Sequence, residues 1–164
     1  MLKTEIVINA PPDIVWRVLT RFRKWDEWNP VINRIRYKRG ADTGRISIRL
    51  LPWVPSFSVQ VAIIDLRDKS QFGWRPCLLS ARVFQGEHLF ALISPAPHSV
   101  RFVQTETYSG VLAPVIGPFL KPLSRQAFKR MDDCLKSACE AVDTAESGEL
   151  VAPANVGQPT GSQQ

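Results

Sequence analysis

The chain has 164 residues, of which 45% are hydrophobic, and a formal net charge of +6 at pH 7. This length predicts one domain with one core. The sequence has no apolar run of about 18 residues, the length that a transmembrane helix needs, so no such helix is predicted. The positive charge favours anionic partners, such as lipid headgroups, nucleic acid or acidic ligands, without selecting among them. The three cysteines have no metal-ligand spacing and are expected to be reduced thiols in a cytoplasmic protein.

The N-terminal residues predict a strand, a helix and a short helical turn. Residues 4–10 alternate in the manner of a strand, and Pro11 and Pro12 end that strand and begin a helix. Trp25 and Trp28 suit one helical turn, which Asn29 and the proline after it end. Two interpretations of this turn stay open. Either both tryptophans plug one end of the core, or Trp28 or Asn29 borders the mouth of a pocket.

Six further strands are expected between residues 31 and 109. Short turns join consecutive strands, which favours an antiparallel sheet. The expected ranges are 31–39, 45–51, 57–66, 71–79, 81–93 and 100–109. The first two form a hairpin with a basic outer face. No aromatic residues interleave the arginines there, so we expect a solvated surface and no nucleic-acid partner.

Residues 123–142 carry the one long helix pattern of the chain, with an apolar stripe on one side and charged residues such as Asp132 on the other. One long helix after a run of strands predicts a sheet wrapped around that helix. The apolar, proline-containing segment 111–123 is expected to be either a lid or the first irregular turns of this helix. Periodicity is lost towards the C-terminus, so we expect a domain over 1–145 and a disordered tail over 146–164.

The last two strands place polar side chains on a face that also carries large apolar ones. The residues that share this face are His88, Phe90 and Leu92 of one strand and Phe102, Gln104, Glu106 and Tyr108 of the next. Buried polar groups need partners, so they bond one another, hold water or bind the polar end of a ligand. An imidazole near a carboxylate can act as acid and base, which makes His88 and Glu106 the candidate catalytic residues.

Several chemistries have no signature in the sequence. There is no glycine-rich phosphate loop, no paired-cysteine metal motif and no Gly-x-Ser-x-Gly elbow. The sequence therefore predicts neither a metal nor a cofactor.

Five segments together resemble the START-like superfamily, also called SRPBCC, which includes the polyketide cyclase/dehydrase group. Residues 8–16 (INAPPDIVW) and 25–30 (WDEWNP) resemble its opening, and residues 86–90 and 106–112 resemble its later strands. The pattern of Phe128, Met131 and Leu135 is similar to its last helix. The resemblance covers residues 3–143. It implies an α+β helix-grip fold, in which a curved seven-stranded antiparallel sheet wraps around the long C-terminal helix and encloses a hydrophobic cavity.

Members of this superfamily bind lipids, sterols, quinones, plant hormones or polyketides, and some are cyclases or aromatases. The first hypothesis is therefore a carrier or sensor that binds a small hydrophobic molecule, lipid-, quinone- or polyketide-like, between sheet and helix. The expected pocket residues are Phe72, Trp74, Phe90, Leu92, Phe102, Tyr108 and Met131, with His88, Gln104 and Glu106 as polar anchors.

Two other functions stay open. One is a polyketide cyclase or dehydratase that uses the same pocket. The other is an interaction module, in which the apolar segment 111–123 and the basic hairpin meet an anionic membrane or a partner protein. Fold membership alone does not choose among these functions.

Overall fold

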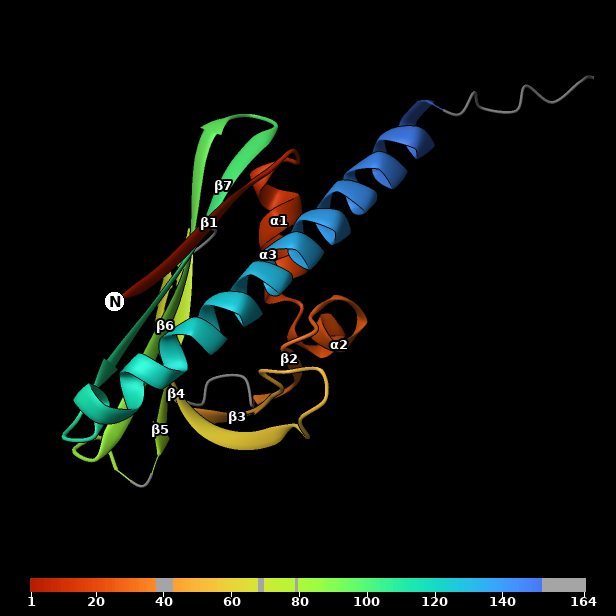
Figure 1. The fold of residues 1–164 in the computed structure, drawn as a ribbon. Coiled ribbons are helices and arrows are strands. Elements are labelled where there is room, and N and C mark those ends of the chain that lie inside the picture. The colour runs from red at the N-terminus through yellow and green to blue at the C-terminus, as the bar shows by residue number, and fades with distance from the viewer. Residues whose placement is uncertain (38–42, 68–69, 79, 152–164) are drawn as a thin grey trace, which may run out of the picture.

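The computed structural model describes residues 1–37, 43–67, 70–78 and 80–151. Figure 1 shows one curved sheet lying along a long C-terminal helix. The strands of the sheet are β1 (Leu2–Ile8), β2 (Ile32–Tyr37), β3 (Thr43–Ile48), β4 (Phe57–Arg67), β5 (Gln71–Leu78), β6 (Phe84–Ala96) and β7 (Ser99–Ser109). All neighbouring strands are antiparallel, in the order β1-β7-β6-β5-β4-β3-β2. The predicted seven-stranded antiparallel sheet is confirmed.

A helical connection joins the two edge strands of this sheet. It consists of α1 (Pro12–Thr20), the short 3-10 helix η1 (Phe22–Lys24) and α2 (Trp25–Trp28). Because β1 and β2 lie at opposite edges, this connection crosses the open side of the sheet beside the C-terminal helix (Figure 1). Pro12 suits the first turn of α1, because backbone N–H groups in a first turn have no acceptor within the helix and proline has no N–H.

The long helix α3 (Ala113–Val151) starts before and ends after the predicted range, residues 123–142. Its first turns contain most of the segment 111–123, so the second of the two interpretations of that segment is observed. The helix also includes residues 146–151, the first residues of the predicted tail. The sequence there still contains good helix formers, and Glu146 pairs with Arg17 of α1. Residues 152–164, also predicted to be disordered, lie outside the described residues.

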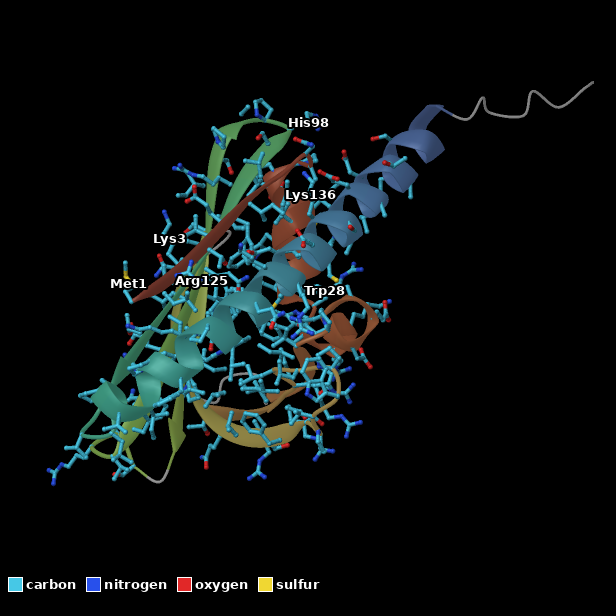
Figure 2. The ribbon with its side chains drawn as sticks, in the orientation of Figure 1. Met1, Lys3, Trp28, His98, Arg125 and Lys136 are labelled. Carbon is cyan, nitrogen blue, oxygen red and sulfur yellow. The ribbon has the colours of Figure 1, made fainter. Side chains whose placement is uncertain are left out.

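The core fills the space between the concave face of the sheet and the helices. Trp25 is completely buried, its indole N–H donates to the carbonyl of Leu19 at 2.9 Å, and its ring lies 5.5 Å from that of Trp74. Trp28 packs 5.1 Å from Trp25, on α2 beside α3 (Figure 2). These contacts confirm that the two tryptophans close one end of the core.

Asn29 fixes the turn that follows α2 rather than bordering a pocket mouth. Its side chain is 3% exposed, and its carbonyl oxygen accepts hydrogen bonds from the backbone N–H groups of Val31 and Ile32 at 2.9 and 2.8 Å. Its amide lies 2.9 Å from the sulfur of Met131 on α3. On the opposite flank, Lys136 of α3 donates to the carbonyl of Val7 on β1 at 2.7 Å (Figure 2). The first contact joins α3 to the turn between α2 and β2, and the second joins it to β1. In the described ranges, no helix is both long enough and apolar enough to cross a bilayer.

Candidate functional site

Two adjoining cavities lie between the sheet and the first half of α3. The larger has a volume of about 270 Å³ and is bounded by β3, β4, β5, β6, β7 and α3. The smaller has a volume of about 40 Å³ and lies deeper, next to Trp74 and His88. Ile48, Leu50, Pro76, Glu106 and Ser124 line both cavities. Most of the lining is apolar, and the polar side chains gather where the two cavities meet.

Glu106 is the acidic group at this junction. The hydroxyl of Tyr108 donates to Glu106 Oε2 at 2.6 Å and lies 2.9 Å from the hydroxyl of Ser124 on α3. Strand periodicity brings Glu106 and Tyr108 to the concave face, and Ser124 is 5% exposed on the facing side of the helix. Burial raises the pKa of Glu106, whereas the hydrogen bonds from Tyr108 and Ser124 lower it. Burial and the neighbouring Glu106 raise the pKa of Tyr108.

His88 belongs to a separate, fully buried chain of hydrogen bonds. Its Nε2 lies 3.0 Å from Gln104 Oε1, and Gln104 Nε2 donates to Asp132 Oδ1 at 2.5 Å. The imidazole is stacked between the rings of Phe90 and Phe128, with centroids at 4.2 and 4.4 Å. Burial lowers the pKa of His88 to about 3, so the ring is neutral near pH 7 and donates from Nε2 to the Gln104 carbonyl.

Asp132 was expected on the polar face of the C-terminal helix, and this expectation is wrong. The residue is 3% exposed, and burial raises the pKa of its carboxyl to about 6. Ser124, Phe128 and Asp132 follow one another at intervals of four residues. Such spacing places them on one helix face, and this signal would have identified both Ser124 and Asp132 as residues facing the sheet.

The structure divides the predicted pocket residues into two groups. Trp74, His88, Glu106 and Tyr108 line the cavities. Six other buried residues pack in the core and do not line either cavity: Phe72, Phe90, Leu92, Phe102, Gln104 and Met131. Aromatic rings fill the space between sheet and helices around these residues. Phe72, for example, stacks on Phe90 with ring centroids 4.7 Å apart. Sequence reasoning missed the cavity walls contributed by Leu50, Phe57, Ile116 and Leu120.

His88 and Glu106 face each other across β6 and β7 but serve different networks. They are direct partners in the strand register. The imidazole bonds to Gln104, however, and the carboxylate accepts from Tyr108. The predicted acid–base pair therefore has its two groups close in the sheet, each engaged with another partner.

A larger and more open hollow of about 1250 Å³ lies between η1 and strands β2, β3 and β4. Arg21, Arg23, Lys24, Arg36 and Arg45 line it. This hollow is a basic surface concavity outside the space between sheet and α3. We therefore take the smaller apolar cavities as the candidate site, because small-molecule sites are mostly apolar with a few placed polar groups.

Comparisons with known proteins agree with this architecture. Solved structures with similar folds include a START superfamily protein from Mycobacterium smegmatis (18% identity, TM-score 0.69, 86% of this chain and 97% of that chain). The protein TTHA0849 from Thermus thermophilus is similar over 86% of this chain and 97% of its own (14% identity, TM-score 0.65). The di-domain ARO/CYC BexL from the BE-7585A biosynthetic pathway is similar over 85% of this chain and 46% of its own (14% identity, TM-score 0.67).

At these identities the structural similarities show the fold alone. A comparison with curated proteins gives no match. The model of one family, described as polyketide cyclase / dehydrase and lipid transport, matches residues 2–142. The START-like resemblance of the sequence is thereby confirmed, and the chain belongs to the polyketide cyclase/dehydrase and lipid transport family.

Proposed function

We propose that the protein binds a small, largely hydrophobic molecule in the two adjoining cavities, as a cytoplasmic carrier or sensor. The supporting observation is an apolar cavity of about 270 Å³ with Glu106, Tyr108 and Ser124 together at its inner end. Small-molecule sites typically occupy roughly 300–1,000 Å³, so this cavity favours a compact ligand of one or two rings over a molecule with two long acyl chains. Either description of the family, cyclase/dehydrase or lipid transport, requires such a cavity.

The residues proposed to contact the ligand are those that line the cavities. Glu106, Tyr108 and Ser124 supply the polar contacts, while Trp74 and His88 close the inner end. The other predicted pocket residues, which pack in the core, support this wall from behind. Gln104, for example, holds His88 in place through its hydrogen bond.

A cavity-filling substitution tests the proposal. N-phenyl-1-naphthylamine, a neutral apolar dye that fluoresces when it leaves water, serves as the probe. Leu120 is partly buried on α3 and lines the larger cavity, so Leu120→Trp should fill the cavity and abolish binding of the dye. Phe119, beside Leu120 in the chain, is 74% exposed and does not line the cavity, so Phe119→Trp is the matched control and should bind as the wild type does. Equal dye binding by both variants would place the dye elsewhere. Native mass spectrometry of the purified protein then identifies any molecule that copurifies.

An enzymatic role in the same pocket is the second candidate, and Glu106 is the observation that favours it. A carboxyl whose pKa is raised by burial and which faces a cavity can transfer protons. His88 is unsuited to this role because it stays neutral and hydrogen-bonded to Gln104. The two functions differ in what happens to the ligand: a carrier returns it unchanged, whereas a dehydratase returns it without water, in a reaction that Glu106→Gln should abolish.

Four exposed apolar side chains, here called the rim, belong to segments that also contribute to the wall of the larger cavity or adjoin such a segment. Phe57 lines the cavity and is 47% exposed, so the cavity reaches the surface there. Trp53, in the loop just before Phe57, is 77% exposed, and Val115 and Phe119 on the first turns of α3 are 63% and 74% exposed. We propose that this rim contacts an anionic membrane from which the ligand is taken up or to which it is delivered.

Charge complementarity favours a membrane as the partner of this rim. Lys121 and Arg125 are exposed on α3 just after the rim residues, and cations near apolar groups favour anionic headgroups. Cosedimentation with vesicles of phosphatidylcholine and phosphatidylglycerol should decrease in Trp53→Ser and with added salt. Ile93→Ser, at a residue 43% exposed on β6, is the matched control. Binding that is insensitive to both Trp53→Ser and salt would refute the membrane contact.

A further inference from the structure

The carboxyl of Glu106 has an unusual position for a charged group. It lies at the junction of the two cavities, among Ile48, Leu50 and Pro76. Among the described residues that line these cavities there is no Lys and no Arg. His88, opposite Glu106 in the strand register, has a neutral imidazole. Burying a carboxyl without a cation costs free energy, and this cost must be offset by hydrogen bonds to the carboxyl.

The protein supplies only part of those hydrogen bonds. The hydroxyls of Tyr108 and Ser124 carry one hydrogen each, and the Tyr108 hydrogen goes to Glu106 Oε2. A carboxylate has about four acceptor positions, so at most half of them receive a donor from these two side chains. The remaining capacity is that of an acceptor, and it faces the space where a ligand would lie.

Gly86 keeps that space open. It lies opposite Tyr108 in the strand register and lines the larger cavity. A Cβ atom at this position would lie 3.7 Å from Glu106 Oε1. Since Gly86 has no side chain, Oε1 can be approached from the larger cavity.

We propose that the bound molecule directs a hydroxyl or amino group at Glu106 Oε1, and that molecules ending in a carboxylate or phosphate are excluded. This inference rests on the proposed function and specifies the chemical class of its ligand. A donor group completes the hydrogen bonding of the carboxyl. A second anion would lie beside Glu106 with no cation to compensate it, which is unfavourable in a cavity walled by apolar groups.

Four naphthalene derivatives with one ring system and different head groups test the proposal. They are 2-naphthol, 2-methoxynaphthalene, 2-acetonaphthone and 2-naphthoate, each competing with N-phenyl-1-naphthylamine. In the wild type, 2-naphthol should bind roughly tenfold or more tightly than 2-methoxynaphthalene, because only the naphthol has a hydrogen to donate. The naphthoate should bind most weakly. These comparisons use the wild-type protein and so do not depend on the folding of a variant.

The variant Glu106→Gln then tests whether Glu106 is the group that discriminates among the head groups. The glutamine amide can donate as well as accept, so the affinity for 2-acetonaphthone should rise relative to that for 2-naphthol. The preference for 2-naphthol over 2-methoxynaphthalene should fall to about threefold or less. Glu87 is the matched control, because it lies on neighbouring β6 and pairs with Arg75 at 2.6 Å outside the cavities. Glu87→Gln should keep the wild-type preference.

The outcomes separate this inference from the function on which it rests. Equal binding of the four compounds, or tighter binding of the naphthoate or the ketone than of the naphthol, would overturn the ligand class and leave the proposed cavity function standing. An unchanged naphthol preference in Glu106→Gln would overturn the role of Glu106. If neither the dye nor any of the four compounds binds, the proposed function itself fails.

Discussion

Replacing His88 by Phe should change how the stability of the protein depends on pH. Burial lowers the pKa of His88 from 6.5 to about 3. Between these pH values the unfolded chain binds a proton that the folded protein does not, so stability is lost as pH falls below 6.5. From pH 7 to pH 5 this linkage lowers the free energy of unfolding by about 2 kcal/mol. Phe cannot titrate, and its ring can keep the stacking between Phe90 and Phe128.

The substitution also has a cost that does not depend on pH. It removes the donor to Gln104 Oε1, which should destabilise the protein by about 1–3 kcal/mol at pH 7. The difference between His88→Phe and wild type should therefore shrink by about 2 kcal/mol on going from pH 7 to pH 5.

Urea unfolding followed by tryptophan fluorescence at the two pH values measures this difference. His98→Phe is the matched control, because the other histidine of the chain is exposed, and it should follow the wild type at both pH values. A constant difference between His88→Phe and wild type would refute the reasoning. So would an NMR titration of the wild type in which the His88 ring gains its proton between pH 7 and pH 5.

Three further substitutions have predictable effects on stability. Gly110 has a φ of +98°, and a Cβ there would lie 2.6 Å from the carbonyl oxygen of Val83, so Gly110→Ala should cost about 2 kcal/mol or more in a thermal melt; an unchanged melting temperature would contradict this. Gly117 lies inside α3 directly before Pro118, and in helical backbone a Cβ on the residue before a proline clashes with the proline ring, so Gly117→Ala should not show the gain of about 0.5–1 kcal/mol that this change gives elsewhere in a helix, and a raised melting temperature would contradict this. Asp132 has its pKa raised from 3.8 to about 6, so the unfolded chain loses this proton first and stability falls as pH rises through that window, by up to about 3 kcal/mol. In urea unfolding, the free energy of unfolding of Asp132→Asn should rise relative to that of wild type between pH 4 and pH 7. Parallel curves of unfolding free energy against pH for the two proteins would count against this.

Most of the fold could be predicted from sequence because its signals are local. Period-two alternation indicates the strands, and one amphipathic stripe indicates a helix that the sheet must cover. The start of α3 was set too late because Pro114, Pro118 and Pro122 suggest a break, yet the packing of the first turns against the sheet outweighs it. Its end was set too early because residues 146–151 have little apolar periodicity and include Gly148, a poor helix former.

The candidate site was less predictable, because a cavity is a property of packing between distant elements. Strand parity correctly places His88, Gln104 and Glu106 on the inner face. Parity cannot show that Trp25 fills the space beside Trp74 and Phe90, which leaves room only towards the other end of the sheet. That room depends on how far β3 and β4 curve away from α3, and no residue pattern within one strand records it.

The two prolines inside α3 also determine which part of that helix unfolds locally most readily. Pro118 and Pro122 have no N–H, so the carbonyls of Pro114 and Pro118 lack the helical donor four residues on. Separating these turns from the sheet breaks fewer hydrogen bonds than opening the helix after Ser124, and amide hydrogen exchange should be faster over residues 115–121 than over 124–142. Ile116 and Leu120, which form the cavity wall, lie on these turns. Fraying of one helix end is then enough to expose the cavity, and the residence time of a bound molecule depends on a local unfolding rate that replacing the prolines by alanine would lower.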